Sequence, residues 1–255
     1  MAYCSICQHT VSHWLPHPHK DQRSPLMTLL GTVGSDLSRY GCPSCHSNDR
    51  LRHLWLYMGA TGLSERLAGA TILHVAPEPE LERLIAQLGP ARYIRGDLHP
   101  TRPDHQRIDI EALPFADASL DIALCNHVLE HVNSPAQALG ELFRCLKPGG
   151  VLIAQTPYAP SIKQTFELHQ RPDADTARLL FGQDDHVRLF GSDIASYFHA
   201  AGFQGDLLQH ATLLPEISAE EAGCNAHEPF FVFWKAAAAA PGTPNRTPAD
   251  HAAAV

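Results

Sequence analysis

The chain has 255 residues and a formal net charge of −8, with 19 basic and 27 acidic side chains. This length suffices for one α/β core with a small appendage. The acidic balance disfavours a nucleic-acid partner, because proteins that bind phosphate backbones present a basic surface. No apolar run reaches the roughly 18 residues of a membrane span, and the N-terminus lacks a charged-then-apolar secretory pattern. We therefore expect a cytoplasmic enzyme without a membrane partner.

Two Cys-x-x-Cys pairs stand near the N-terminus, Cys4 with Cys7 and Cys42 with Cys45. A two-residue spacer lets both thiolates of a pair point at one ion, and four thiolates suit tetrahedral zinc. Such a closed site would be structural, and it would supply folding energy to a zinc-ribbon-like segment over residues 1–48. Chance or redox-active pairs are the competing interpretation. Four histidines between the pairs are alternative ligands: His9, His13, His17 and His19.

A helix is predicted after the second cysteine pair, at the start of a main domain over residues 49–235. Asn48 can cap it, and its apolar residues recur at helical spacing. This helix would fasten the ribbon to the main domain. Arg50 and Arg52 lie on it and could face a substrate, although solvated helix charges are the more common case. The apolar stripe consists of Leu51, Leu54, Trp55 and Met58.

Two strands and a helix are predicted next. Residues 71–76 (TILHVA) read as a strand, and residues 79–88 (PELERLIAQL) read as a helix with one apolar face. Residues 92–95 read as a second strand, with Asp97 at its end. Glu78 stands at the start of the helix, where a negative charge is favourable in itself.

The segment 120–157 is the most informative part of the chain. Residues 120–125 form an apolar run typical of a buried parallel strand, which places Asn126 and His127 at its carboxyl end, where open α/β sheets bind ligands. Ser134 and a following proline can start a helix. Residues 147–150 (KPGG) would end that helix, and a further strand would follow.

The strings VLEHV and LKPGGVL, at this spacing, resemble a class I S-adenosylmethionine-dependent methyltransferase. The string CPSC-x-S-x-x-R-x-R-x-L-W-L-Y resembles the junction in bacterial methyltransferases with an N-terminal zinc-binding segment. The resemblance covers nearly the whole chain before residue 236 and implies a Rossmann-like α/β fold, with a mostly parallel seven-stranded sheet and helices on both faces. Residues 227–235 would be the last strand. Residues 236–255, rich in alanine, read as a disordered tail.

The resemblance also implies a site for S-adenosylmethionine. Asp97 takes the place of the acid that accepts protons from both ribose hydroxyls, Leu98 would flank the adenine, and Glu78 could meet the ammonium group. The turn after the first strand, residues 76–79, lacks the usual glycines, and His74 stands where an acid is common. The cofactor-binding candidates are Ala76, Glu78, Asp97, Leu98, Asp109, Ile110, Asn126 and His127.

Methyl transfer from a sulfonium needs alignment and a deprotonated nucleophile, so positioning supplies much of the rate. The catalytic candidates are His127 and His186, with Asp185 orienting His186. An equal alternative makes the segment 182–188 a structural cluster. The substrate candidates are Tyr158, Gln183 and Arg188.

The functional prediction is methyl transfer from S-adenosylmethionine to an oxygen, nitrogen or sulfur nucleophile of a small molecule, with specialised-metabolite or glycan biosynthesis as candidate settings. One alternative is an RNA-modifying methyltransferase that grips RNA with its zinc ribbon. Another is a non-catalytic binding module with a degenerate cofactor site.

Overall fold

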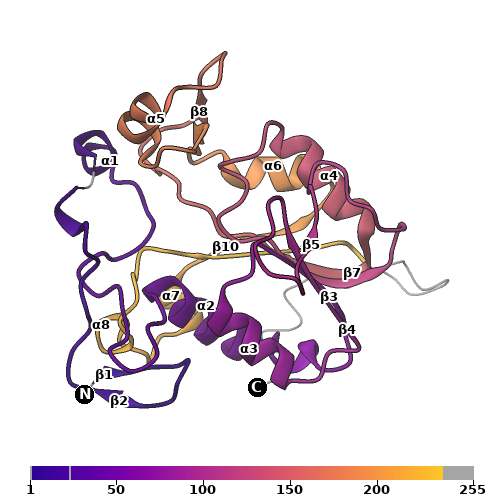
Figure 1. Ribbon diagram of the computed structural model, residues 1–255, viewed down its shortest axis with the longest axis horizontal. Helices are drawn as coiled ribbons and strands as arrows, with labels where there is room; N and C mark the ends of the chain where they lie inside the picture. The colour runs from indigo at the N-terminus through magenta and orange to yellow at the C-terminus, as the bar shows by residue number, and fades with distance from the viewer. Residues whose placement is uncertain (1, 23, 238–255) are drawn as a thin grey trace.

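The computed structural model describes residues 2–22 and 24–237, and a twisted seven-stranded sheet lies at its centre (Figure 1). The strand order is β10-β11-β7-β6-β3-β4-β5. Six of the strands run in the same direction, whereas β11 is antiparallel to both of its neighbours. The predicted Rossmann-like, mostly parallel seven-stranded sheet is thereby confirmed. The strands are β3 (Thr71–Val75), β4 (Arg92–Asp97), β5 (Gln106–Arg107), β6 (Leu120–Leu124), β7 (Leu146–Ile153), β10 (Gln204–Leu208) and β11 (Phe230–Trp234).

Helices cover both faces of the sheet, as predicted. On one face, α4 (Pro135–Cys145) and α6 (Ile194–Ala200) share a hydrophobic cluster with the strands. On the other face, α2 (Asp49–Ala60) and α3 (Pro79–Gln87) share a second cluster. Each face of β3 and β6 therefore meets a helix layer, which explains why these strands are almost continuously apolar.

The predicted helix starts agree with the capping contacts. The side chain of Asn48 accepts a hydrogen bond from the amide of Leu51 at the start of α2, and Ser134 does the same for Gln137 at the start of α4. Residues 147–150 were expected to separate α4 from the next strand. Instead α4 ends at Cys145 and these residues already belong to β7, whose pairing with β6 shifts register at this point.

The N-terminal segment packs against the main domain. It contains the short hairpin β1 (Ala2–Tyr3) and β2 (Thr10–Val11), the 3-10 helix η1 (Lys20–Gln22) and α1 (Pro25–Leu29). Ile6, Val11 and Trp14 join the cluster that contains α2 and α3, whereas Met27 of α1 belongs to a third cluster. No hydrophobic boundary therefore separates residues 2–22 and 24–48 from the domain beside them, and the division at residue 48 stays a prediction.

Arg52 is neither solvated nor exposed to a substrate, so both sequence interpretations of it were wrong. Its side chain is fully buried, and its guanidinium donates to five backbone carbonyls. It also lies over the ring of Trp14, 4.0 Å from the centroid. Arg52 thus joins the N-terminal segment to the chain at the end of α8 (Ala219–Ala222). The five carbonyls belong to Arg39, Tyr40, Ser47, Ala222 and Gly223.

A long connection leads from β7 to β10 and on to β11. This connection contains a two-stranded sheet in which β8 pairs with β9. The predicted last strand, residues 227–235, is present as the shorter β11. In the described part of the chain, no helix has the length and apolarity to cross a membrane. The predicted tail falls mostly on residues 238–255, outside the described residues. The remaining elements are η2 (Glu65–Leu67), β8 (Phe166–Glu167), α5 (Ala174–Phe181), β9 (Arg188–Leu189), α7 (His210–Leu213) and α8 (Ala219–Ala222).

Candidate functional site

The candidate site lies at the carboxyl ends of β3 and β6. From β3 the chain proceeds outward to β4 and β5, and then returns to form β6 on the other side of β3. Strand order therefore reverses between β3 and β6, and open α/β sheets bind ligands at such a switch point.

The turn that leaves β3 bends sharply although it contains no glycine. Ala76 has a φ of +47°, in the left-handed region, and its amide donates to the carbonyl of Gly96 at 2.7 Å. A side chain in that conformation costs roughly 1–2 kcal/mol, and such backbone strain is concentrated at functional sites. Ala76 thus adopts a backbone conformation that glycine would adopt at a lower conformational free energy.

Glu78 is held at the start of α3 by a histidine from β3. Its Oε2 lies 3.1 Å from Nε2 of His74, whose Nδ1 contacts the hydroxyl of Tyr93 at 2.8 Å. Burial raises the pKa of Glu78, but the hydrogen bond and charge of His74 outweigh burial and leave this pKa below its ordinary value. Glu78 is therefore a carboxylate at neutral pH. The sequence analysis missed the role of His74, for which a polar residue inside an apolar strand was the available signal.

The predicted adenosine-binding residues lie at the end of β4 and shortly beyond it. Asp97 is the last residue of β4, and its Oδ1 accepts from the amide of His99 at 2.7 Å. Leu98 is 48% exposed, as an apolar surface for a ring would be. Asp109 is exposed and accepts from the amide of Glu111, whereas Ile110 is buried.

Asn126 and His127 follow β6, as predicted. The Oδ1 of Asn126 accepts from the amide of Gln155, but its buried Nδ2 has no partner among the described residues. His127 has a φ of +54°, and its Nδ1 lies 3.5 Å from Oε1 of Glu130. A buried donor without a partner costs about 1–3 kcal/mol, so an acceptor from outside the described residues would stabilise the amide of Asn126.

Two opposite charges add to this set of unpaired atoms. Nε of Arg50 and Oε2 of Glu228 are buried without a hydrogen-bond partner among the described residues, and the Glu228 oxygen lies 3.9 Å from Nδ1 of His53. Burial raises the pKa of Glu228, against the opposing charges of His127 and Arg50. The sequence analysis gave Arg50 no definite role and missed Glu228, because nothing in its local sequence shows that it returns to the sheet edge.

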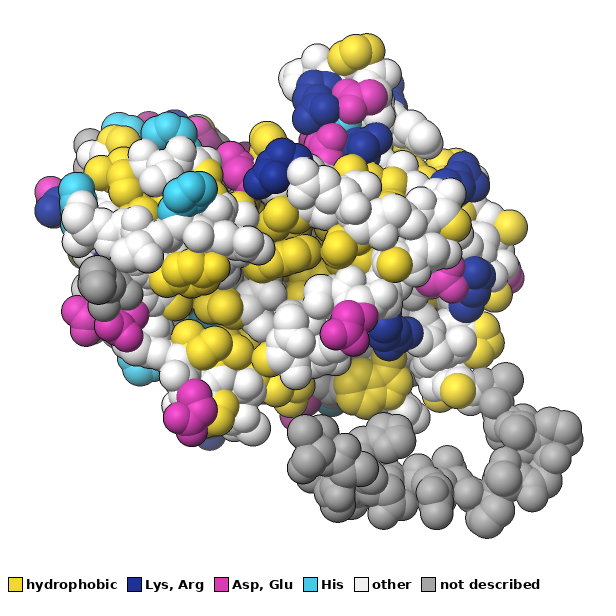
Figure 2. Space-filling view, turned by 90° about the horizontal axis from the view of Figure 1, so that it is seen from below, with side chains coloured by type: hydrophobic (Ala, Val, Ile, Leu, Met, Phe, Trp, Pro, Cys, Tyr) yellow, Lys and Arg dark blue, Asp and Glu magenta, His cyan; other side chains and the backbone are white. Residues whose placement is uncertain are grey.

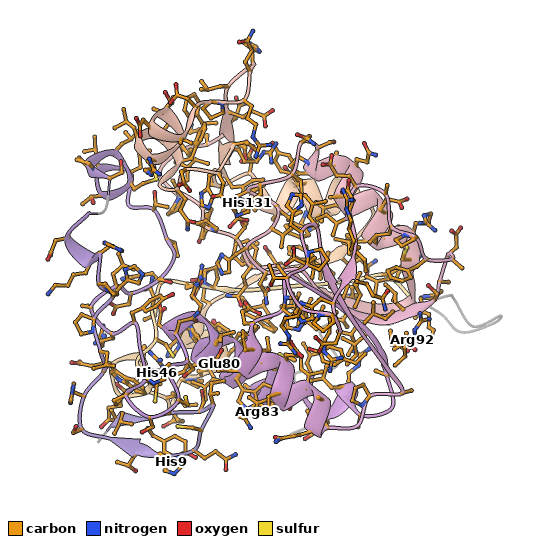
Figure 3. The ribbon with its side chains drawn as sticks, in the orientation of Figure 1. His9, His46, Glu80, Arg83, Arg92 and His131 are labelled. Carbon is orange, nitrogen blue, oxygen red and sulfur yellow. The ribbon has the colours of Figure 1, made fainter. Side chains whose placement is uncertain are left out.

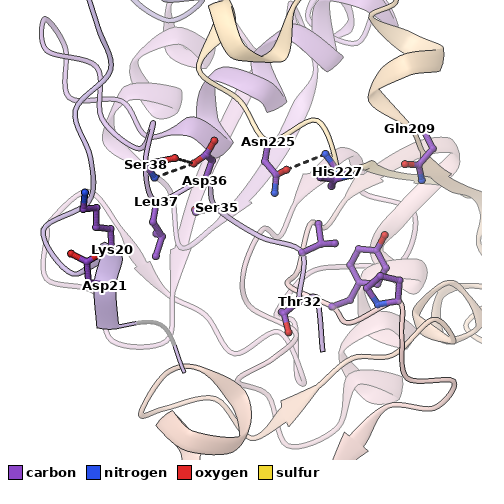
Figure 4. A pocket seen from close by; sticks show the side chains of 14 residues that line it. Lys20, Asp21, Thr32, Ser35, Asp36, Leu37, Ser38, Gln209, Asn225 and His227 are labelled. Atoms are coloured by element: carbon purple, nitrogen blue, oxygen red, sulfur yellow. Dashed lines mark hydrogen bonds between the residues drawn. The ribbon is translucent and has the colours of Figure 1, made fainter. Parts of the chain in front are cut away.

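A hollow of about 940 Å³ lies beside this edge, between the N-terminal segment and the chain before β11 (Figure 4). Tyr158 lines it, and the backbone of Tyr158 pairs with that of Val33 through hydrogen bonds of 2.8 and 3.3 Å. This volume falls within the range of small-molecule sites. The labelled residues are Lys20, Asp21, Thr32, Ser35, Asp36, Leu37, Ser38, Gln209, Asn225 and His227.

Two candidates on the segment 182–188, Arg188 and Asp185, need correction, and the role of Gln183 stays a prediction. Arg188 was expected to meet an acidic substrate group, but it is buried, donates to three backbone carbonyls and pairs with Glu167. Asp185 was expected to orient His186, but its Oδ2 lies 3.3 Å from Nδ1 of His131. Gln183 is exposed and is not among the residues that line the hollow beside Tyr158.

His186 is buried, and its Nδ1 lies 3.0 Å from the carbonyl oxygen of Phe181. Burial lowers its pKa, so its imidazole is neutral at neutral pH. Burial raises the pKa of the neighbouring Glu130, but the hydrogen bond and charge of His127 and the charges of His186 and His131 bring it down to about 2. The segment is therefore docked on the turn after β6 by polar contacts.

The four cysteines of the two pairs gather at one point. Their sulfur atoms all lie within 4.8 Å of one another, with Cys4 3.8 Å from Cys45 and Cys7 3.9 Å from Cys42. Zinc–sulfur bonds of about 2.3 Å in a tetrahedron separate the sulfurs by about 3.8 Å, so the cluster fits zinc. This group includes none of the four intervening histidines.

The two cysteine pairs also have the same backbone geometry. Gln8 and His46, each four residues after the first cysteine of its pair, both have a φ of +61°. In each pair the first cysteine accepts from that residue's amide and donates to the carbonyl of the residue after it, His9 or Ser47. A repeated loop that points two sulfurs at the same place is the geometry that a shared ion requires.

The comparisons with known proteins concern the central part of the chain. A family model described as a methyltransferase domain matches residues 58–154. The chain is 38% identical over 141 residues to an uncharacterized methyltransferase of Mycobacterium leprae, covering 54% of this chain and 48% of the relative. It is 34% identical over 131 residues to a probable S-adenosylmethionine-dependent methyltransferase of Mycolicibacterium smegmatis, covering 48% and 46%. The chain thus spans about half the length of these relatives.

Solved structures show weaker similarity. A methyltransferase from Mesorhizobium loti aligns with a TM-score of 0.44 and 18% identity, covering 70% of this chain and 98% of that protein. A Burkholderia thailandensis methyltransferase was solved with 1,6-didemethyltoxoflavin and S-adenosylhomocysteine. It aligns with a TM-score of 0.44 and 15% identity, covering 74% of this chain and 81% of that protein. These similarities do not bear on the acceptor or the mechanism. The family match and the relatives show that residues 58–154 are similar in sequence to a methyltransferase domain.

Proposed function

We propose that the protein transfers a methyl group from S-adenosylmethionine to a small-molecule acceptor. The observation that carries this proposal is a set of buried polar atoms that have no hydrogen-bond partner among the described residues. Asn126 offers a donor, and Arg50 and Glu228 offer opposite charges. A ligand with an ammonium and a carboxylate, such as the methionine part of the cofactor, would satisfy groups that are costly to leave unpaired.

The rest of the cofactor would extend from that point toward the end of β4. Asp97 would accept from the ribose hydroxyls, and the exposed apolar surface of Leu98 would cover the adenine, with Asp109 and Ile110 on its other side. Glu78, fixed as a carboxylate by His74, would meet the ammonium group. Ala76 would bring the backbone close to the cofactor through its left-handed turn.

The acceptor would bind in the hollow that Tyr158 lines. Lys20, Asp21 and the surrounding hydroxyl groups give the hollow polar groups and both signs of charge beside its apolar side chains, as a small metabolite with polar groups requires. On the face seen in Figure 2, Lys and Arg side chains are scattered among acidic ones, and the chain is acidic overall. Neither observation favours RNA as the acceptor.

His127 is the residue that we propose as the base for an acceptor that must lose a proton. It follows the strand end at the switch point, and Glu130 can stabilise the imidazolium that proton transfer produces. His186 and Asp185 are less suited, because His186 is buried and Asp185 is paired elsewhere. Methyl transfer requires only alignment and the removal of this proton from the acceptor, since the thioether leaves as a neutral group.

We also propose that zinc fills the four-cysteine cluster and holds the N-terminal segment in place. All four protein ligands are cysteines, so this zinc would have no open position for chemistry. It would fix one wall of the hollow, to which the N-terminal segment contributes.

Calorimetric titration with S-adenosylmethionine tests the proposal. We expect the wild-type chain to bind the cofactor, and we expect Asp97→Ala to weaken binding by about 1.5 to 3 kcal/mol, the range for hydrogen bonds to a charged group. Asp206→Ala, an exposed carboxylate on β10, should leave the affinity unchanged. If the wild-type chain did not bind the cofactor, the proposed activity would be wrong; binding without turnover on any acceptor would favour the non-catalytic alternative.

A further inference from the structure

A carboxylate and two imidazoles meet beside the turn that leads into α4. Glu130 and His131 belong to that turn, and His186 comes from the segment between α5 and β9. One ligand atom of each lies within 4.8 Å of the other two. The imidazole centroids are 4.7 Å apart, with the rings nearly perpendicular, and His131 lies between α5 and α4 in the view of Figure 3. We propose that these three side chains bind a divalent first-row transition-metal cation.

Both imidazoles are oriented as in metal sites. Nδ1 of His186 lies 3.0 Å from the carbonyl oxygen of Phe181, and Nδ1 of His131 lies 3.3 Å from Oδ2 of Asp185. A metal-bound histidine almost always donates its other N–H to a carbonyl or carboxylate, which fixes the tautomer and the ring orientation. Each Nε2 is then the nitrogen with a lone pair, and it is available to a cation.

Glu130 has a charge that its neighbours do not balance with a permanent cation. Its side chain is 1% exposed, and its Oε2 accepts from the hydroxyl of Thr156 at 2.8 Å. Its ion-pair partner among the described residues is His127, at 3.5 Å, and no lysine or arginine in that part of the chain pairs with it. A buried carboxylate needs a partner of opposite charge, which a bound divalent cation would supply.

A second carboxylate–histidine cluster shows what a balanced site looks like. Glu82, Asp104 and His105 also bring three ligand atoms within 4.8 Å of one another. There, however, Glu82 is paired with Arg95 at 2.9 Å and with Arg102 at 3.0 Å. Two guanidinium groups already compensate this carboxylate, so a cation would gain little. The same residue types therefore give a metal site in one place and a salt-bridge network in the other.

The ligand set defines the class of cation. Two imidazoles and one carboxylate suit zinc, iron, cobalt or nickel, whereas magnesium and calcium prefer oxygen ligands alone. Three protein ligands leave coordination positions for water or another molecule. The site is distinct from the cysteine cluster and does not depend on the proposed methyltransferase activity.

The test is a calorimetric titration of Co²⁺ into the full chain after the cysteine cluster has been loaded with zinc. We expect one equivalent to bind, with weak visible absorption that lacks thiolate charge-transfer bands. Asp185→Asn removes the carboxylate behind His131 and should weaken binding about 10- to 100-fold. Asp184→Asn is the matched control, because Asp184 pairs with Arg178 instead.

His131→Ala removes a ligand that is 30% exposed, so this variant should fold and lose the Co²⁺ equivalent. His105→Ala, in the balanced cluster, should bind Co²⁺ like the wild-type chain. The double variant His17→Ala with His19→Ala should also bind one equivalent of Co²⁺. If only this double variant lost the Co²⁺, the ion would bind to those two histidines, and the proposal would be wrong. The proposal is wrong if no Co²⁺ binds, or if His131→Ala binds Co²⁺ with wild-type affinity.

Discussion

Glu78 and His74 contact each other across the start of α3, with Oε2 of the carboxylate 3.1 Å from Nε2 of the imidazole. The glutamate side chain is one-quarter exposed and the histidine is fully buried. The buried imidazole on β3 therefore fixes the carboxylate, one quarter of which stays exposed. A chain that needed only a favourable helix-terminal charge would not require this buried support.

The first prediction concerns the charge of Glu78. Glu78→Gln should weaken S-adenosylmethionine binding by about 1.5 to 3 kcal/mol, because a charge-assisted hydrogen bond to the ammonium group is lost. Calorimetry measures the change. Glu80→Gln, two residues further along the same helix, is the matched control and should bind like the wild-type chain. Equal affinities in both variants would assign Glu78 to helix stability alone.

The second prediction concerns zinc. Cys42→Ser should abolish stoichiometric zinc, because three cysteines no longer close the tetrahedral set, and the N-terminal segment should become sensitive to proteolysis. Metal analysis of the purified chain measures the zinc. Cys145→Ser is the control, since its sulfur is also buried but lies outside the cluster. Full zinc retention in Cys42→Ser would mean that a histidine completes the site.

The third prediction concerns Arg52. Arg52→Lys should lower the free energy of unfolding by about 3 kcal/mol, because lysine has three donors for five carbonyls and no planar group to lie over Trp14. Denaturant unfolding measures the loss. Arg178→Lys, half-exposed and paired with the exposed Asp175, should change stability by less than about 0.5 kcal/mol. If the two variants had similar stabilities, the five carbonyls would not depend on the guanidinium.

The parts of the fold that could be predicted are those that local sequence determines. Period and capping residues located α2, β3, α3, β6 and α4, whereas the order of the strands in the sheet came from the structure. Arg52 and Arg188 could not be interpreted in this way, because their carbonyl partners come from distant segments: Gly223 is 171 residues away from Arg52. An arginine on an amphipathic helix has the same local sequence whether solvent or a buried ring of carbonyls surrounds it.

The same distinction, between local sequence signals and contacts between distant segments, applies to the candidate site. Asp97 ends a strand, and Asn126 and His127 lie just after one, so the predicted strand ends located them. Glu228 was missed because β11 returns antiparallel to the sheet and brings the residue before it to the same edge as the ends of parallel strands. Asp185 was misassigned because adjacency in sequence suggested a pairing with His186, whereas the turn directs its carboxylate to His131.

The last prediction concerns Asp49, whose fully buried carboxyl group begins α2. Its Oδ2 accepts from the amide of Asp36, and its Oδ1 has no partner among the described residues. Burial, reinforced by the charge of Glu228, raises the pKa of Asp49 from 3.8 to about 7, against the opposing hydrogen bond from Asp36 and the charges of Arg50 and Arg52.

The folded chain therefore binds this proton more tightly than the unfolded chain does. The associated stability is fully present below pH 4 and is lost as pH rises through about 7. Asp49→Asn keeps an acceptor for the Asp36 amide but cannot ionise, so its stability advantage over the wild-type chain should grow by about 2 to 3 kcal/mol between pH 5 and pH 8. Asp175→Asn, almost fully exposed, should show no such trend. Denaturant unfolding across this pH range measures the difference, and a difference that stayed constant would show that Asp49 is ionised throughout and that its charge is compensated in the folded chain.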